Sequence, residues 1–190
     1  MLDRRTFLAG PALAAFGNMA RAADEAWAAL ARGGHAALMR HAQTVPGTGD
    51  PPGFRLEDCS TQRNLSEAGR AAAARLGGAY RERGVRVARV LSSQWCRCLD
   101  TGTALGLARV EAAPEALNSF FDARGEAQRS TAALRALLSA LPAEGTVAVL
   151  VTHQVNITAL TGIFPAMGET LVLRLDAAQG FPVAGRIAGG

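Results

Sequence analysis

The sequence predicts a single α/β domain, a three-layer αβα sandwich in which a mainly parallel sheet carries helices on both faces. Its 190 residues are 49% hydrophobic and 19% charged, which is ordinary for one soluble domain and enough to bury a sizeable core. Strand-like and helix-like segments alternate along the chain, as they do when parallel strands are joined by helices. The continuous apolar run of residues 146–151 is typical of a buried parallel strand.

The first half of the chain supplies two strands and two helices of this sandwich. Residues 36–39 form a short apolar run that predicts the first strand, followed by a loop rich in Gly, Pro and Asp at residues 45–54. Ser66, with Glu67 and Asn64, supplies N-terminal capping chemistry for a helix that continues to about Arg83. Residues 87–91 predict the second strand, and residues 95–105 predict a helix.

The second half continues the alternation. Leucines at helical spacing predict an amphipathic helix over residues 127–141, which Pro142 ends. The apolar run of residues 146–151 is the next strand, and a helix begins near residues 156–160. Residues 171–175 predict a last strand, for which an edge position is one option. No internal repeat or linker divides the chain, so residues 23–190 are expected to form one domain.

Residues 1–22 are predicted to be an export signal and not part of the fold. Arg4-Arg5 precede a short apolar stretch at residues 9–16, and Ala20-Arg21-Ala22 places small residues where a signal peptidase reads. Paired arginines before Phe7-Leu8 resemble a twin-arginine signal, which predicts a periplasmic protein of a bacterium. The alternative is an uncleaved amphipathic N-terminal helix. The apolar stretch is too short to span a bilayer of about 30 Å, so no stable membrane insertion is expected.

The charged residues exclude several classes of function. All 20 basic residues are Arg, so no lysine-dependent phosphate loop or Schiff base can exist. Removal of three Arg and one Asp with residues 1–22 leaves 17 positive against 15 negative side chains, a net charge of +2. The arginines are scattered and have few aromatic neighbours, which argues against nucleic-acid binding.

The three cysteines permit at most one internal disulfide. Cys59 can pair with Cys96 or with Cys98, whereas the last two are too close in sequence to pair easily with each other. Their spacing matches neither a zinc knuckle nor a redox Cys-x-x-Cys motif.

Three polar clusters each follow the end of a predicted core strand. They are Arg40-His41, Ser92-Ser93 with Arg97 one helical turn later, and His153. Ligands of open parallel sheets bind in the crevice beyond these strand ends, so the clusters are expected to meet in one pocket.

This set of side chains suits a phosphoryl group. Arginine forms bidentate, permanently charged hydrogen bonds to phosphate oxygens. An imidazole beside two guanidiniums has its cationic form disfavoured, which leaves a neutral nucleophilic nitrogen near pH 7. Attack by that nitrogen on phosphorus would give a phosphohistidine and divide hydrolysis into two displacements.

These residues carry a resemblance to a known family. Leu38-Met39-Arg40-His41-Ala42 resembles the Arg-His-Gly signature of the histidine phosphatase (phosphoglycerate mutase-like) superfamily, and the ordered matches span roughly residues 35–160. The other matching segments are Leu65-Ser66-Glu67-Ala68-Gly69, Ser92-Ser93-Gln94-Trp95-Cys96-Arg97 and Val151-Thr152-His153. The resemblance implies the phosphoglycerate mutase-like fold, His41 as phosphate acceptor, and Arg40, Arg97 and His153 as the remainder of the phosphate pocket. It implies neither a metal nor another cofactor.

The sequence departs from the family pattern where a proton donor is expected. Gln154 follows His153 in place of the Asp of one branch, and Leu117 leads to Asn118 and Ser119 in place of the Glu of the other. The candidate acid is Asp122, with Glu126 behind it, and the alternative is that both are surface carboxylates. Ala42 replaces the usual glycine.

Further side chains receive weaker assignments. Arg63 and Thr44 are candidates for the substrate rim, although the polar segment around Arg63 can equally serve to cap the next helix. Asp100 is expected to orient Arg97 or to form a helix salt bridge. His35 is expected to be structural.

The leading hypothesis is therefore an exported phosphomonoester hydrolase acting on a small-molecule or glycan phosphomonoester of the envelope or periplasm. The alternative is a phosphate- or phosphoglycan-binding protein of the same fold that has lost turnover. A mutase is disfavoured because the chain lacks long insertions, and a zinc hydrolase because no compact ligand spacing exists. The sequence makes no prediction of oligomeric state.

Overall fold

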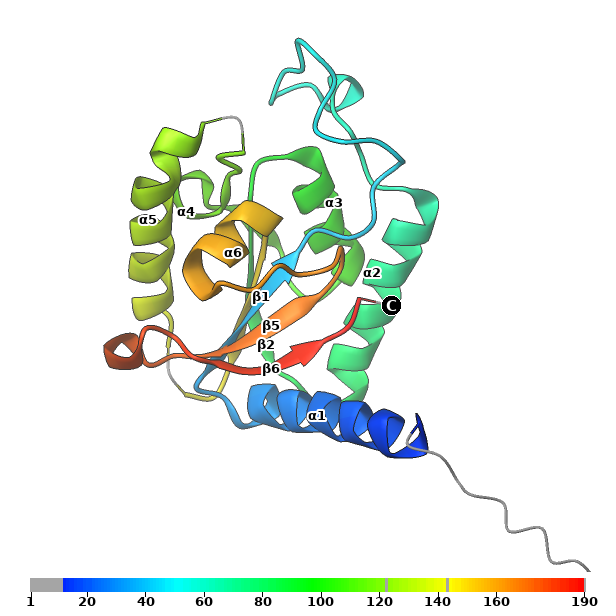
Figure 1. The fold of residues 1–190 in the computed structure, drawn as a ribbon, viewed down its shortest axis with the longest axis vertical. Coiled ribbons are helices and arrows are strands. Elements are labelled where there is room, and N and C mark those ends of the chain that lie inside the picture. The colour runs from blue at the N-terminus through cyan, green and yellow to red at the C-terminus, as the bar shows by residue number, and fades with distance from the viewer. Residues whose placement is uncertain (1–11, 122, 143, 190) are drawn as a thin grey trace, which may run out of the picture.

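A mixed six-stranded sheet in the order β3-β2-β4-β1-β5-β6 lies at the centre of the fold (Figure 1). The computed structural model describes residues 12–121, 123–142 and 144–189, with only the backbone given for residues 12–20 and 124. The first four strands are parallel to one another, whereas β5 is antiparallel to β1 and β6 is antiparallel to β5. The strands are β1 (His35–Arg40), β2 (Val87–Ser92), β3 (Val110–Ala112), β4 (Val147–Thr152), β5 (Thr170–Arg174) and β6 (Val183–Ile187).

Helices cover both faces of the sheet, as predicted. One core cluster joins one face of the sheet to α1, α2 and α3, and a second joins the other face to α4, α5 and α6. Successive residues of β4 point to opposite faces of the sheet and so belong to different clusters. The first cluster contains Val147, Val149 and Val151, and the second contains Ala148 and Leu150. The helices are α1 (Ala12–Arg32), α2 (Glu67–Glu82), α3 (Cys96–Leu105), α4 (Pro114–Leu117), α5 (Ala127–Ser139) and α6 (Gln154–Thr161).

The described part of the chain begins with a helix that the sequence analysis named only as the alternative to an export signal and did not extend beyond residue 22. Helix α1 runs continuously past Ala22, the residue at which the export signal was predicted to end. Its buried side chains recur at helical spacing, and they pack against β6, β5 and β1. The Trp27 ring meets the Tyr80 ring of α2 edge-on at 4.9 Å between centroids. Residues 24–32 therefore belong to the domain itself.

The strand predicted at residues 171–175 is present as β5, but it is neither the last strand nor at the edge that the sequence left as one option. β5 lies inside the sheet between β1 and β6, and four of its five residues are buried. The edge is formed by β6, whose alternating exposure and central Gly185 give only a weak strand pattern. The three-residue β3 at the opposite edge also went unpredicted.

The start of α2 matches its predicted cap only in part. Ser66 Oγ accepts a hydrogen bond from the Gly69 backbone N–H at 3.0 Å, as an N-cap does. Asn64 does not cap this helix, because its side chain donates instead to the Cys59 carbonyl at 2.6 Å. The capping prediction thus holds for Ser66 and fails for Asn64.

A long loop between β1 and α2 projects from the sheet end where the parallel strands finish (Figure 1). A disulfide between Cys59 and Cys96 fastens this loop to the first residue of α3. Cys98 is free and buried. The pairing left open by the sequence is therefore Cys59 with Cys96. Separately, none of the helices in the described ranges is long and apolar enough to cross a membrane.

Candidate active site

The three polar clusters gather in one cleft because their strands are neighbours. β2, β4 and β1 lie side by side and parallel. The residues that follow each of these strands therefore meet at the end of the sheet where the carboxyl ends of the strands lie. The cleft has a volume of about 280 Å³. Arg40, His41, Arg97 and His153, which the sequence placed in one pocket, all line it, as does Arg63.

His41 lies at the bottom of this cleft with 3% of its surface exposed. Its backbone N–H donates to the Thr152 carbonyl at 3.0 Å, which ties it to the end of β4. The ring Nδ1 lies 2.9 Å from the Ala42 carbonyl oxygen. A carbonyl only accepts hydrogen bonds, so the ring proton is on Nδ1 and the lone pair is on Nε2.

The charge state of His41 follows from its surroundings. Burial lowers the pKa of His41 to about 3; the Ala42 carbonyl opposes this shift, and the positive charges of Arg97 and Arg40 add to it. The imidazole is therefore neutral at pH 7, and its Nε2 is available to act as a nucleophile.

His153 is the second buried imidazole of the cleft, and its ring centroid lies 5.6 Å from that of His41. Its Nε2 lies 2.9 Å from Ser93 Oγ and 3.5 Å from Cys98 Sγ. The Trp95 ring meets it edge-on at 5.3 Å. Burial, followed by the charge of Arg97, keeps the pKa of His153 well below its usual value, so this ring is also neutral.

Each of two cleft guanidiniums retains a buried donor without an acceptor. Arg40 Nη1 donates to the Pro165 carbonyl at 2.9 Å, and Arg97 Nη1 donates to Asp50 at 2.7 Å. The Nε atoms of Arg40 and Arg97 are buried and have no hydrogen-bond partner within the described residues. Buried donors are rarely left unpaired in proteins, so these two N–H groups are suited to an oxyanion.

Asp50 is a member of the cleft that the sequence interpretation missed. Its carboxylate pairs with Arg97, and the side chains of both are more than nine-tenths buried. It also accepts from Trp95 Nε1 at 3.0 Å and from the Arg63 backbone N–H at 3.0 Å. Burial alone would raise the pKa of Asp50, but the hydrogen bonds from Arg63 and Arg97 bring it below its usual value. Asp50 is therefore an ionised carboxylate.

The charges that line the cleft can be compared with those of a ligand. Its lining among the described residues contains the guanidiniums of Arg40, Arg63 and Arg97, one carboxylate and two neutral imidazoles. Three positive charges and one negative charge leave a net charge of two positive. This balance is complementary to a phosphomonoester dianion.

The two predicted rim residues lie in different places. Arg63 lines the cleft, where its Nε donates to the Gly49 carbonyl at 2.8 Å. Thr44 is outside the lining and accepts a hydrogen bond from Arg63 Nη1. Thr44 thus contacts the residue that faces the cleft.

The expected acids are not brought into the cleft among the described residues. Asp122 lies outside those residues. Glu126 lines a different cavity and forms an ion pair with Arg129, 2.9 Å away. Asp100 does not orient Arg97, because its carboxylate pairs with Arg70 of α2. His35 begins β1 at the opposite end of the strand, where Nδ1 lies 2.7 Å from the Gly33 carbonyl.

The segment that stands where the family places a Glu has a different function in this chain. Asn118 Oδ1 accepts from the Gln94 backbone N–H at 2.8 Å and from Ser93 Oγ at 3.1 Å. It thereby supports the serine that contacts His153. Ser119 lines the cleft. No cluster of three His, Cys, Asp or Glu side chains suited to a metal occurs in the described part of the chain.

Solved structures of low sequence identity share the fold. The protein histidine phosphatase SixA, complexed with tungstate, is 17% identical with a TM-score of 0.57, over 82% of this chain and 97% of that one. A mycobacterial glucosyl-3-phosphoglycerate phosphatase is 19% identical with a TM-score of 0.52, over 73% of this chain and 89% of that one. No protein-family model and no curated protein matches the sequence. The fold is that of the histidine phosphatases, as the resemblance predicted.

Proposed function

We propose that this protein is a phosphomonoester hydrolase in which His41 accepts the phosphoryl group. One observation carries the proposal: a neutral imidazole with its Nε2 lone pair available lies at the bottom of a cleft lined by three guanidiniums. The structures that share the fold add support, because those reported above are phosphatases. The proposal requires neither a metal nor a cofactor.

The reaction divides into two displacements at phosphorus. In the first, the Nε2 lone pair of His41 forms an N–P bond while the P–O bond to the leaving group breaks and its electron pair departs with that oxygen. The hydrogen bond from Nδ1 to the Ala42 carbonyl stabilises the positive charge that develops on the ring. In the second, water attacks phosphorus, the N–P electron pair returns to Nε2 and inorganic phosphate is released.

The remaining cleft residues bind and stabilise the transferring group. The unpaired Nε–H groups of Arg40 and Arg97 would donate hydrogen bonds to the equatorial oxygens of the phosphoryl group, where negative charge accumulates. The Ser93 hydroxyl donates its proton to Asn118, so Ser93 Oγ accepts from Nε2–H of the neutral His153 ring and holds that ring beside His41. Asp50 holds Arg97 in place from the opposite side.

Histidine substitutions test the proposal. With p-nitrophenyl phosphate, whose leaving group needs little protonation, we expect EDTA-resistant turnover that His41→Ala abolishes. His35→Ala is the matched control because His35 lies at the far end of β1, and it should retain activity. A radiolabelled phosphate donor should give an acid-labile label on His41. Turnover by His41→Ala equal to that of the wild type would refute the proposal.

A binding protein without turnover is the second candidate. Among the described residues, Asp50 is the only carboxylate that lines the cleft, and its ion pair with Arg97 keeps it deprotonated. A substrate with a poor leaving group would then bind without reacting. Calorimetric binding of inorganic phosphate together with no release of p-nitrophenol would establish this alternative.

Export to the periplasm and action on an envelope or periplasmic phosphomonoester are part of the same proposal. They rest on Arg4-Arg5, the short apolar stretch and Ala20-Arg21-Ala22. Fractionation of bacteria that express the full chain should recover it in the periplasm. Replacement of Arg4-Arg5 by two lysines should keep it in the cytoplasm.

A further inference from the structure

The exposed large apolar side chains of the protein are concentrated near the cleft. Within the described residues they are Val45, Phe121 and Phe164, exposed by 43%, 49% and 68%. Phe121 lines the cleft, and the Phe164 ring lies 5.9 Å from the guanidinium carbon of Arg40, which also lines it. Two of the three therefore border the site at which a phosphate is expected.

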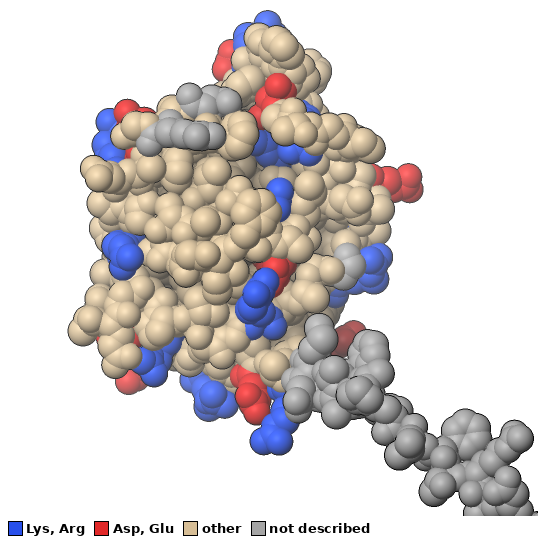
Figure 2. Space-filling model, viewed as in Figure 1, with Lys and Arg blue, Asp and Glu red and all other residues tan. Residues whose placement is uncertain are grey.

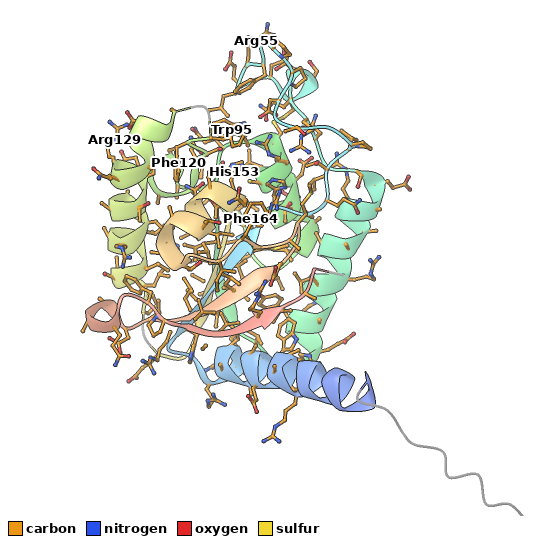
Figure 3. The ribbon with its side chains drawn as sticks, in the orientation of Figure 1. Arg55, Trp95, Phe120, Arg129, His153 and Phe164 are labelled. Carbon is orange, nitrogen blue, oxygen red and sulfur yellow. A yellow bond between two sulfur atoms is a disulfide. The ribbon has the colours of Figure 1, made fainter. Side chains whose placement is uncertain are left out.

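The cleft wall continues this apolar character above the arginines. Trp95, Phe121, Val155 and Met167, from four separate segments, line it together with the charged groups. Residues 154–168, which form α6 and the loop after it, contain no charged side chain. Figure 2 shows this face largely free of charge, and Figure 3 shows Trp95, His153 and Phe164 one below another in the same view, with His153 buried behind the surface.

The three arginines of the cleft already have acceptors within the protein. Arg97 is paired with Asp50, Arg63 donates to Gly49 and Thr44, and Arg40 donates to Pro165. The buried donors of these arginines that are left over are the Nε atoms of Arg40 and Arg97. A charged or strongly hydrated leaving group would lose water at the exposed Phe121 and Phe164 rings without gaining a hydrogen bond from them.

We propose that the phosphomonoester hydrolysed here has an apolar aryl leaving group, a phenol, which packs on a rim formed by Phe121, Val155 and Phe164. This inference rests on the proposed phosphatase function and specifies its substrate class. In-line displacement sends the leaving group away from His41, which is at the bottom, and therefore toward this rim. Contact with the leaving group would cover the exposed phenyl rings, as apolar pocket walls do for their ligands.

A pair of esters isolates the contribution of the rim. Phenyl phosphate and 4-hexylphenyl phosphate release phenols of nearly equal pKa, so their chemical steps match and only the apolar area differs. We expect kcat/KM to be about tenfold higher for the hexyl ester, mainly through KM, because burial of two methylene groups is enough for such a factor. The measurements are made at ester concentrations below aggregation.

Variants locate the effect. Phe121→Ser and Phe164→Ser should each reduce the ratio of the two kcat/KM values toward one. Val45→Ser is the matched control, an exposed apolar residue outside the cleft lining, and it should keep the wild-type ratio. Equal kcat/KM values for the two esters in the wild type would overturn the rim proposal and leave the phosphatase function standing.

A binding measurement separates failure of the rim from failure of the function. If neither ester nor p-nitrophenyl phosphate is turned over, the phosphatase proposal fails. The rim is then decided by the Kd values of phenylphosphonate and 4-hexylphenylphosphonate, which resist hydrolysis. About tenfold tighter binding of the hexyl compound supports the rim, and equal Kd values overturn it.

Discussion

At the scale of single residues, the cleft combines groups that would repel one another if all were charged. Three guanidiniums surround His41 and His153, and burial keeps both imidazoles in their neutral form. The neutral form is the one that the proposed reaction needs, because only a free lone pair can attack phosphorus. The same burial makes these histidines a weakness of the folded state in acid.

Stability should therefore fall as the pH is lowered from about 6.5 toward 3. In this window the unfolded state binds more protons than the folded state, because the pKa of His41 is about 3 in the fold and 6.5 without it. The cost from His41 alone is about 2 kcal/mol at pH 5. Urea unfolding at pH 7 and pH 5 measures how much unfolding free energy is lost between the two pH values. This loss should be smaller for His41→Asn than for the wild type, whereas His35→Asn should lose as much as the wild type.

Asp50 sets the charge of the cleft, so its removal should change anion binding. Asp50→Asn raises the net charge of the lining by one, and we expect the inhibition constant of inorganic phosphate to fall about three- to tenfold. Asp100→Asn is the control, since Asp100 pairs with Arg70 outside the cleft and should not alter inhibition. Weaker inhibition by phosphate in Asp50→Asn would show instead that its main role is to position Arg97.

At the scale of elements, α2 reaches its neighbours through glycines. A Cβ at Gly77 would lie 1.8 Å from the Leu105 carbonyl oxygen of α3, and a Cβ at Gly69 would lie 2.0 Å from the Gln43 carbonyl oxygen near His41. The first contact sets the spacing of α2 and α3. The second sets the distance between α2 and the loop that follows the nucleophile.

Gly77→Ala should consequently destabilise the protein, although alanine favours a helix. Separation of α2 from α3 costs about 1–3 kcal/mol by overpacking, against a gain of at most about 1 kcal/mol in helix propensity. The neighbouring Gly78→Ala is the control, because its Cβ would meet only the Arg81 side chain, at 4.0 Å, and it should be neutral or stabilising. Chemical denaturation should show that the free energy of unfolding changes with opposite sign in the two variants, or that Gly77→Ala loses clearly more of it than Gly78→Ala.

At the scale of the whole molecule, the pattern of apolar residues along the sequence was enough to predict the central strands and the helices around them. It was not enough to predict the strands at the two edges of the sheet. β1, β2, β4 and four helices follow apolar patterns that local sequence already displays. Neither β3 nor β6 does, because an edge strand of three residues or one with a glycine at its middle acquires its structure from pairing. Helix α1 was predicted only as the alternative to an export signal, because its first residues resemble one.

The site residues also separate into those that the sequence predicts and those that it does not. Arg40, His41, Arg97 and His153 follow strand ends or begin helices, so topology alone predicts that they meet. Asp50 and Asn118 act through hydrogen bonds to residues 47 and 25 positions away, and nothing in the local sequence signals such contacts. A lone Asp in a Gly- and Pro-rich loop is indistinguishable from a turn residue.

Truncation distinguishes the two parts of α1. A chain that begins at Ala23 keeps the buried Ala26, Trp27, Ala29 and Leu30, and its thermal midpoint should remain within a few degrees of the full chain. A chain that begins at Gly34 loses all four, a cost of more than about 5 kcal/mol, and its midpoint should fall by roughly 10 °C or more. Equal midpoints for the two truncated chains would contradict the assignment of residues 24–32 to the core.

The Cys59–Cys96 bond has a consequence for how the protein matures. Cys59 lies on the surface of the projecting loop, whereas Cys96 has only 3% of its surface exposed. In thiol–disulfide exchange on the folded chain, an oxidase would therefore form its mixed disulfide with Cys59, and the Cys96 thiolate would then displace it from within. Oxidative maturation would thus run in a fixed order, from the outer sulfur to the inner one.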